Sequence, residues 1–229
     1  MNIFEYQNEV IQILNNSFTK NHLSHAYIFE GPKGSGTKEI AVYLAQKLLC
    51  LNNNSACGEC ENCIRVKNGT HTNVIIISPM GDTIRKDQIA GIIHEGQMTS
   101  VTDKNRIFII EEADKLNIAS ANTLLKFLEE PYPNNYVVLL TTNANKLLDT
   151  IVSRTQLLRF KPINKEEIVN QLIKSNIEKD YAYILSELYG NVEDAMAAYK
   201  EESVNNAIDL FKKLVNAKQN NKDLYIEYY

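Results

Sequence analysis

A glycine-rich segment constrains this chain more than any other feature of its sequence. Residues 31–38 read GPKGSGTK, which is the glycine spacing of a phosphate-binding P-loop. Gly31, Gly34 and Gly36 would let backbone N–H groups curl around an anion at the N-terminus of the following helix, where the helix dipole favours negative charge. Because such a loop joins a strand to a helix, the segment predicts a βαβ unit.

The sequence up to Pro162 fits this expectation, because short apolar runs alternate with stretches of helical spacing. The runs expected to form buried strands are Ala26–Phe29, Val74–Ile77, Ile107–Ile110, Tyr136–Leu140 and Leu157–Phe160. The apolar residues at helical spacing between them are Ile40, Leu44 and Leu48, then Ile89, Ile92 and Ile93, then Leu124, Leu125 and Leu128. This alternation predicts an α/β domain over residues 1–162, with a parallel sheet and helices on both faces.

Beyond Pro162 the sequence shows helical patterns only. The candidates are Lys165–Lys174, Asp180–Tyr189 and Val192–Lys200, and the Gly190-Asn191 pair is expected to form a turn. They predict a small helical domain over residues 163–204. A last amphipathic stretch, Ala207–Val215, precedes a polar segment rich in Asn and Lys.

Charge and hydropathy exclude several classes of protein. The 24 Lys and Arg residues and 28 Asp and Glu residues give a net charge of −4, which argues against a broad basic face for DNA. No apolar run approaches the roughly 18 residues that a membrane helix needs. The N-terminal MNIFEYQNEV lacks the basic-then-apolar order of a signal peptide. We expect a cytoplasmic chain with reduced thiols and no membrane partner.

The end of the glycine-rich loop departs from a working nucleotide site. A functional loop ends in Gly-Lys-Ser/Thr, because the lysine neutralises the β- and γ-phosphates and the hydroxyl binds Mg²⁺. Here Thr37 and Lys38 stand in the reverse order, and Lys33 is a weak substitute. We expect that ATP is neither bound nor hydrolysed. A plain glycine turn between strand and helix is the alternative interpretation.

A second, weaker signal follows the apolar run Ile107–Ile110. Glu111 and Glu112 resemble the Walker B pair, in which the first carboxylate serves Mg²⁺ and the second polarises water. A Glu in the first place moves the carboxylate by one methylene, which disturbs the near-ideal geometry that Mg²⁺ demands. We interpret Glu111 as an acidic strand end that faces solvent.

All four cysteines fall in one short segment. Cys50, Cys57, Cys60 and Cys63 have the spacing C-x6-C-x2-C-x2-C, and four thiolates complete the tetrahedral shell of a structural Zn²⁺. This predicts a zinc module at residues 50–63 that folds a polar loop onto the end of the first helix. An iron–sulfur cluster and a disulfide are the less favoured alternatives. Four histidines lie outside the cluster, and their spacing is not that of metal ligands: His22, His25, His71 and His94.

Several segments, in order, resemble the bacterial clamp loader subunits of DNA polymerase III. They are His25–Pro32, the four-cysteine insert, Gly69–His71, Glu111–Leu116, Asn122–Pro131 and Ile151–Arg154. The altered loop is similar to the delta prime branch, because the gamma/tau branch keeps an intact Gly-Lys-Thr and Asp-Glu pair. The resemblance implies an AAA+ fold with a three-helix second domain. It also implies a non-hydrolysing subunit that supports loading of the sliding clamp in DNA replication.

The resemblance further implies roles for single residues. The family motif Ser-Arg-Cys carries an arginine finger, and Ser153-Arg154-Thr155 keeps the guanidinium that would stabilise charge on a neighbour's γ-phosphate. Glu193 stands where ATP-binding relatives have a sensor arginine, so its carboxylate would repel triphosphate. A third, collar domain is implied as well, of which residues 205–229 can hold only the beginning.

The implied partners are the gamma/tau and delta subunits and, indirectly, the sliding clamp and primer-template DNA. Two other functions stay open. In one, Lys38 or Lys33 rescues the site and the chain is itself an active clamp-loader ATPase. In the other, the chain is a zinc-dependent nucleic-acid adaptor, which ranks last because Asn52–Asn62 contains no Lys, Arg or aromatic residue.

Overall fold

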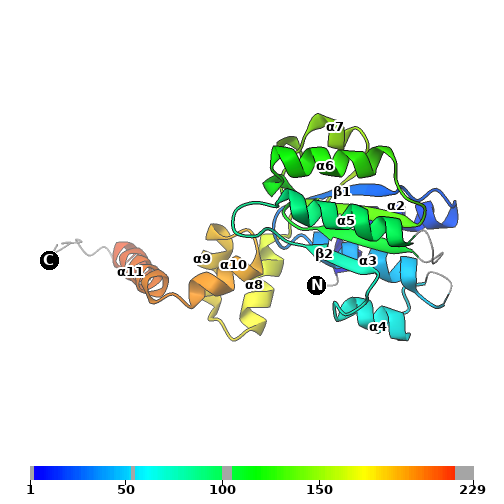
Figure 1. Ribbon diagram of the computed structural model, residues 1–229. Coiled ribbons are helices and arrows are strands. Elements are labelled where there is room, and N and C mark those ends of the chain that lie inside the picture. Colours follow the sequence, from blue (N-terminus) through cyan, green and yellow to red (C-terminus); the bar gives the residue numbers. More distant parts are fainter. Residues whose placement is uncertain (1–2, 53–54, 100–104, 220–229) are drawn as a thin grey trace. The chain divides into compact units, whose positions relative to one another are not determined.

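The computed structural model describes residues 3–52, 55–99 and 105–219. The chain divides into two compact units, Met1–Lys161 and Pro162–Tyr229, which Figure 1 colours from blue to green and from yellow to red. In the described ranges, the first unit contains a sheet with helices and the second contains helices only.

The strands of the first unit are β1 Ala26–Glu30, β2 Val74–Ile77, β3 Arg106–Ile110, β4 Asn135–Thr141 and β5 Gln156–Arg159. They form one parallel sheet in the order β2-β3-β4-β1-β5. Ile28 of β1 is paired with Leu139 on one side and Leu157 on the other, so the strand before the glycine-rich loop runs through the middle of the core. The predicted α/β fold with a parallel sheet is confirmed.

Helices precede and connect the strands of the first unit. They are α1 Ile3–Tyr6, α2 Asn8–Thr19, α3 Thr37–Leu49, α4 Glu61–Lys67, α5 Lys86–Thr99, α6 Ile118–Glu129 and α7 Asp149–Val152, with short 3-10 turns at η1 Ala113–Lys115 and η2 Ala144–Lys146. α6 begins at Ile118 and is capped by Asn117, whose side chain accepts the N–H of Ser120. It ends just before Glu130 and Pro131, since a proline disfavours helical backbone at the residue that precedes it.

Alternate residues of a strand point to opposite sides of the sheet. Helices cover both sides, so both faces of the sheet are buried. Ile28 and Phe108 belong to a core that α5, α6 and α7 cover. Phe29 and Ile109 belong to a second core that α2 and α3 cover. The two helical layers can be followed in Figure 1, and they leave the carboxyl ends of the strands as the edge where side chains from different strands meet.

As far as the structure describes it, the second unit contains four helices, α8 Lys165–Lys174, α9 Lys179–Leu188, α10 Val192–Tyr199 and α11 Glu202–Gln219. Asn164 and Asn191 cap α8 and α10 through their side chains. Leu172, Leu185 and Ile208 lie in one shared apolar cluster. None of the helices in the described part of the chain combines the length and hydropathy of a bilayer-spanning segment.

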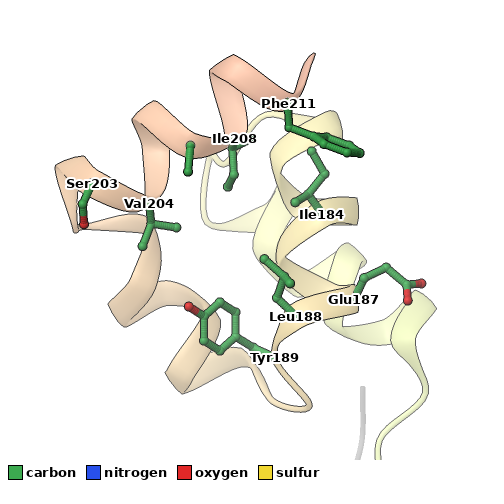
Figure 2. Close-up of a pocket in the computed structure, with 9 residues that line it drawn as sticks. Ile184, Glu187, Leu188, Tyr189, Ser203, Val204, Ile208 and Phe211 are labelled. Atoms are coloured by element: carbon green, nitrogen blue, oxygen red, sulfur yellow. The ribbon is translucent and has the colours of Figure 1, made fainter. Parts of the chain in front are cut away.

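An apolar groove of about 610 Å³ opens on the second unit. Figure 2 shows the side chains that line it, among them Ile184, Leu188, Val204 and Phe211. Leu188 is 64% exposed and Phe211 is 55% exposed. The groove therefore presents apolar surface that the described residues do not cover.

Two helices illustrate how the structure differs from the sequence prediction. α11 is longer than the predicted Ala207–Val215, because the backbone bond from Asn205 N–H to Glu201 O starts the helix earlier and the polar residues that follow contain no Gly or Pro to stop it. The N-terminal α2 is not among the predicted helices. Val10 and Leu14 anchor it in the core, and two buried residues in a polar segment give only a faint periodic signal.

Candidate functional site

The carboxyl ends of the parallel strands gather the candidate residues at one edge of the sheet. The glycine-rich loop follows β1, Glu111 follows β3, and Thr141 ends β4. Gly31 donates its N–H to Thr141 O at 3.0 Å, which ties the loop to the neighbouring strand. Open α/β sheets hold their ligands at this edge.

Packing around the loop accounts for its glycines without any ligand. Gly36 precedes α3 at a φ of 90° and Gly34 has a φ of 78°, conformations that other residues rarely adopt. A Cβ on Gly36 would lie 2.2 Å from Ile3 Cγ1, and a Cβ on Gly31 would lie 2.7 Å from Phe160 Cβ. The shape of the turn therefore requires all three glycines.

Lys38 and Glu111 form an ion pair beside the loop. Lys38 Nζ lies 2.6 Å from Glu111 Oε1, and Ser78 Oγ donates to Glu111 Oε2 at 2.6 Å. Burial alone would raise the pKa of Glu111, but the hydrogen bonds from Lys38 and Ser78 and the charge of Lys38 outweigh it and lower this pKa. The Glu111 side chain is 21% exposed, so the interpretation of Glu111 as a solvent-facing strand end is wrong. Lys38, which stands after Thr37 in the reversed order, is the partner of Glu111.

The other residues of the two motifs do not join this pair. Thr37 is the first residue of α3 and is half-buried, whereas Lys33 is exposed. Glu112 has a left-handed φ of 47° and pairs locally with Lys115 at 2.9 Å. The structure therefore brings together one residue of the loop and one residue of the Walker B-like pair.

The N-terminal segment contacts the loop, which no sequence pattern predicts. Gln7 is 2% exposed, and its Nε2 donates to Ser35 O at 2.9 Å and to Lys161 O at 2.8 Å. Its Oε1 accepts the N–H of Lys161 at 3.1 Å. One buried amide thus links the loop to the last residue of the first unit. A single Gln carries no spacing from which this role could be predicted.

The four cysteine sulfurs converge between α3 and α4. All four Sγ atoms lie within 4.8 Å of one another, and no disulfide joins them. Cys50 Sγ is 3.7 Å from Cys57 Sγ and 4.0 Å from Cys60 Sγ, and Cys57 Sγ is 4.0 Å from Cys63 Sγ. Thiolates about 2.3 Å from a tetrahedral ion lie about 3.8 Å apart. The donors and their separations fit a metal ion.

Hydrogen bonds direct the sulfurs and attach them to α3. Cys60 Sγ accepts the N–H of Cys63 and Cys57 Sγ accepts the N–H of Cys60, each at 3.4 Å, while Gln46 Nε2 donates to Cys63 O at 3.0 Å. Burial raises the pKa of Cys63 to about 12. Burial acts in the same direction on Cys50, but its hydrogen bonds outweigh it and lower the pKa to about 6. Donated N–H groups favour the thiolate, which is the form that binds metals.

Arg154 lies just after α7 and keeps its guanidinium at the surface. Its Nη2 is 3.0 Å from Glu129 Oε1, and its side chain is 38% exposed. Its Nη1 donates to Thr150 O at 3.0 Å and to Ser153 Oγ at 3.4 Å. Ser153 is therefore one of three acceptors around this guanidinium. Glu129 comes from α6, and its contact has no signature in sequence spacing.

The described histidine side chains take no part in the cysteine cluster. His25 Nε2 is 3.3 Å from Leu128 O, and His71 Nδ1 accepts a backbone N–H at 3.1 Å. His22 is exposed, and the side chain of His94 lies outside the described residues. Glu193 is exposed in the first turn of α10, in the second unit.

A family model described as DNA polymerase III, delta subunit, matches residues 6–164 of the chain. The chain belongs to this delta subunit family. Among curated relatives, DNA polymerase III subunit delta' of Bacillus subtilis is 38% identical over 193 residues, which are 84% of this chain and 59% of the relative. DNA polymerase III subunit tau of Bacillus subtilis is 32% identical over 170 residues, which are 73% of this chain and 30% of the relative. This delta family member thus spans about three fifths of the length of its delta' relative.

Solved structures agree with this family at the level of the fold. The RuvB Holliday junction branch migration motor of Thermotoga maritima aligns with a TM-score of 0.53 at 15% identity, over 86% of this chain and 60% of that one. Identity this low shows a shared architecture alone. The chemistry of the delta family member has to be argued from its own side chains.

Proposed function

We propose that this chain is a non-hydrolysing clamp loader subunit of the delta prime type that supports sliding-clamp loading in bacterial DNA replication, in the cytoplasm. The similarity to delta' and tau subunits supports the kind of assembly. The single observation that carries the non-hydrolysing role is the ion pair between Lys38 and Glu111.

This ion pair opposes ATP hydrolysis at the loop. Phosphoryl transfer relies on a lysine at the β- and γ-phosphates and on a hydroxyl and a carboxylate that hold Mg²⁺. Here the positive charge of Lys38 is matched by Glu111, whose oxygens also accept from Ser78. The charge that each group could offer to triphosphate or metal is therefore already matched within the pair. Thr37, at the position of the usual lysine, supplies no positive charge.

Arg154 is the group through which the subunit acts on a neighbour's nucleotide. An arginine presents five N–H donors on a planar cation, which suits the oxygens of a phosphate. We infer that Arg154 stabilises the charge on the γ-phosphate held by an adjacent gamma/tau ATPase. The delta subunit, the sliding clamp and primer-template DNA are further proposed partners, and the last two are reached through the assembly.

The four cysteines are proposed to hold a structural Zn²⁺. Their sulfur separations agree with tetrahedral coordination, and the cluster lies at the end of the helix that follows the glycine-rich loop. When bound, the ion supplies a cross-link that fixes the segment between α3 and α4. We also propose that residues 163–204 form the three-helix domain of the AAA+ fold and that residues 205–229 begin a collar domain.

Reconstitution with Arg154→Ala tests the proposed finger. The loader is assembled from gamma/tau, delta and the full chain, and ATPase and clamp-loading rates are measured. We expect the variant to lower the ATPase rate by about tenfold or more. Arg65→Ala is the matched control, because Arg65 is another exposed arginine in an ion pair, with Glu61 at 2.6 Å. Rates for Arg154→Ala equal to those of the control would refute the finger.

A binding measurement on the isolated chain tests the non-hydrolysing role separately. A fluorescent ATP analogue is titrated with Mg²⁺, and phosphate release is followed at saturation. We expect neither binding nor turnover. Micromolar affinity together with turnover would show that the chain is itself an ATPase.

A further inference from the structure

The guanidinium of Arg154 is held by acceptors from two elements. Thr150 O and Ser153 Oγ belong to the turn that carries the arginine, so they follow it wherever that turn moves. Glu129 belongs to α6 and contacts Nη2 at 3.0 Å. Its carboxylate therefore links the guanidinium to a helix outside the turn that carries the arginine.

Both ends of this contact are fixed by the core. Leu128, next to Glu129, is 3% exposed, and Ile151 of α7 is 0% exposed. The two residues belong to the same apolar cluster. The backbones that carry the carboxylate and the guanidinium therefore have little freedom. Because the ion pair joins these two fixed points, it holds the arginine side chain in one orientation.

We propose that Glu129 is a positioning residue for Arg154, an inference that rests on the proposed arginine finger. An unrestrained arginine has about 2 kcal/mol of rotamer entropy to lose when it meets a ligand. A side chain held in advance loses less, so more of its interaction reaches the transition state. Glu129 thus acts through Arg154 and touches no nucleotide itself.

The contact leaves donors available for a phosphate. The three acceptors engage Nη1 and Nη2, and Nε takes part in none of these contacts. Because a guanidinium has five N–H donors, it can keep Glu129 and still donate to phosphate oxygens. Positioning and phosphate binding are therefore compatible in the same side-chain conformation.

Two substitutions at one position separate the hydrogen bond from the charge. Glu129→Ala removes both, and Glu129→Gln keeps an oxygen acceptor while it removes the charge. In the reconstituted loader we expect Glu129→Ala to lower the ATPase kcat by about two- to fivefold with the KM for ATP unchanged, because the pair is exposed and its contribution is modest. Glu129→Gln is expected to restore most of the rate. Glu130→Ala is the matched control, since Glu130 is an adjacent exposed glutamate without an ion pair among the described residues.

The Arg154→Ala background distinguishes failure of this inference from failure of the finger. With Arg154 absent, Glu129→Ala is expected to have no further effect on kcat. A rate for Glu129→Ala equal to or above wild type overturns the positioning role while the finger stands. A further loss in the Arg154→Ala background shows that Glu129 acts elsewhere and also overturns it. If Arg154→Ala leaves the rate unchanged, the finger and the inference that rests on it both fail.

Discussion

Replacement of Lys38 by Met tests whether the ion pair beside the loop stabilises the fold. Met keeps an aliphatic stem and removes the ammonium that lies 2.6 Å from Glu111 Oε1. The carboxylate then keeps Ser78 as a donor, and no cation offsets its burial. Because Lys38 is 59% exposed and Glu111 is 21% exposed, the pair lies between a surface and a buried one. After allowance for solvent screening we expect a loss of about 1 kcal/mol in the free energy of unfolding at neutral pH.

The pH dependence makes the prediction specific to Glu111. Burial opposes ionisation, but the Lys38 and Ser78 contacts bring the folded pKa below the ordinary value of 4.5. A lowered folded pKa gives stability that is fully present above the unfolded pKa and is lost as the pH falls through the folded one. Without Lys38 the folded pKa rises. The difference between wild type and variant should therefore be largest near neutral pH and shrink in acid.

Urea unfolding from about pH 7 down to about pH 3.5 measures this difference across the titration of a carboxylate. Lys86→Met is the control, because Lys86 is exposed in the same unit and makes no ion pair among the described residues. We expect the control to follow wild type at every pH. An equal loss for Lys38→Met at both ends of the range, or no loss near pH 7, would refute the ion-pair reasoning.

Three other substitutions probe the site. Cys60→Ser, or removal of metal with a strong chelator, should lower the midpoint of thermal unfolding, because a bound Zn²⁺ contributes folding free energy. Metal analysis should find zinc in the wild type, and its absence there would contradict the zinc proposal. Gly36→Ala should destabilise the chain by about 2 kcal/mol or more in urea unfolding, and the control Gly81→Ala by about 1 kcal/mol. Both glycines have a left-handed backbone, but only at Gly36 does an added Cβ meet Ile3. Equal losses would disprove the steric argument. Gln7→Leu should cost about 1 to 3 kcal/mol, because it leaves buried backbone groups without partners, and a loss below that range would show that water replaces the amide.

The sheet could be predicted closely from the sequence. Each of the five strands begins and ends within one residue of the apolar run that predicts it. Buried parallel strands are marked by short runs of branched and aromatic residues, because both of their faces lie in the core. The cysteine cluster was equally accessible, since its ligands are close together in the chain and their spacing alone brings the sulfurs near one another.

The side-chain contacts between segments far apart in the chain could not be predicted in the same way. Gln7 bonds to Ser35 and Lys161, and Glu129 bonds to Arg154, across long stretches of chain. Such pairs depend on how helices pack and leave no periodic trace. The prediction for Glu111 was wrong for the same reason. Its partner Lys38 lies on another element and becomes its neighbour only when β1 and β3 enter one sheet.

The crowding around the glycines has a consequence for how sequences of this kind are searched. Gly31 and Gly36 face Phe160 and Ile3 at distances that no side chain would tolerate, so the turn needs them whether or not a nucleotide ever arrives. A glycine fingerprint therefore reports the path of the backbone. A search that counts such fingerprints selects chains by this turn alone, so the residues after the last glycine and after β3 have to be compared as well.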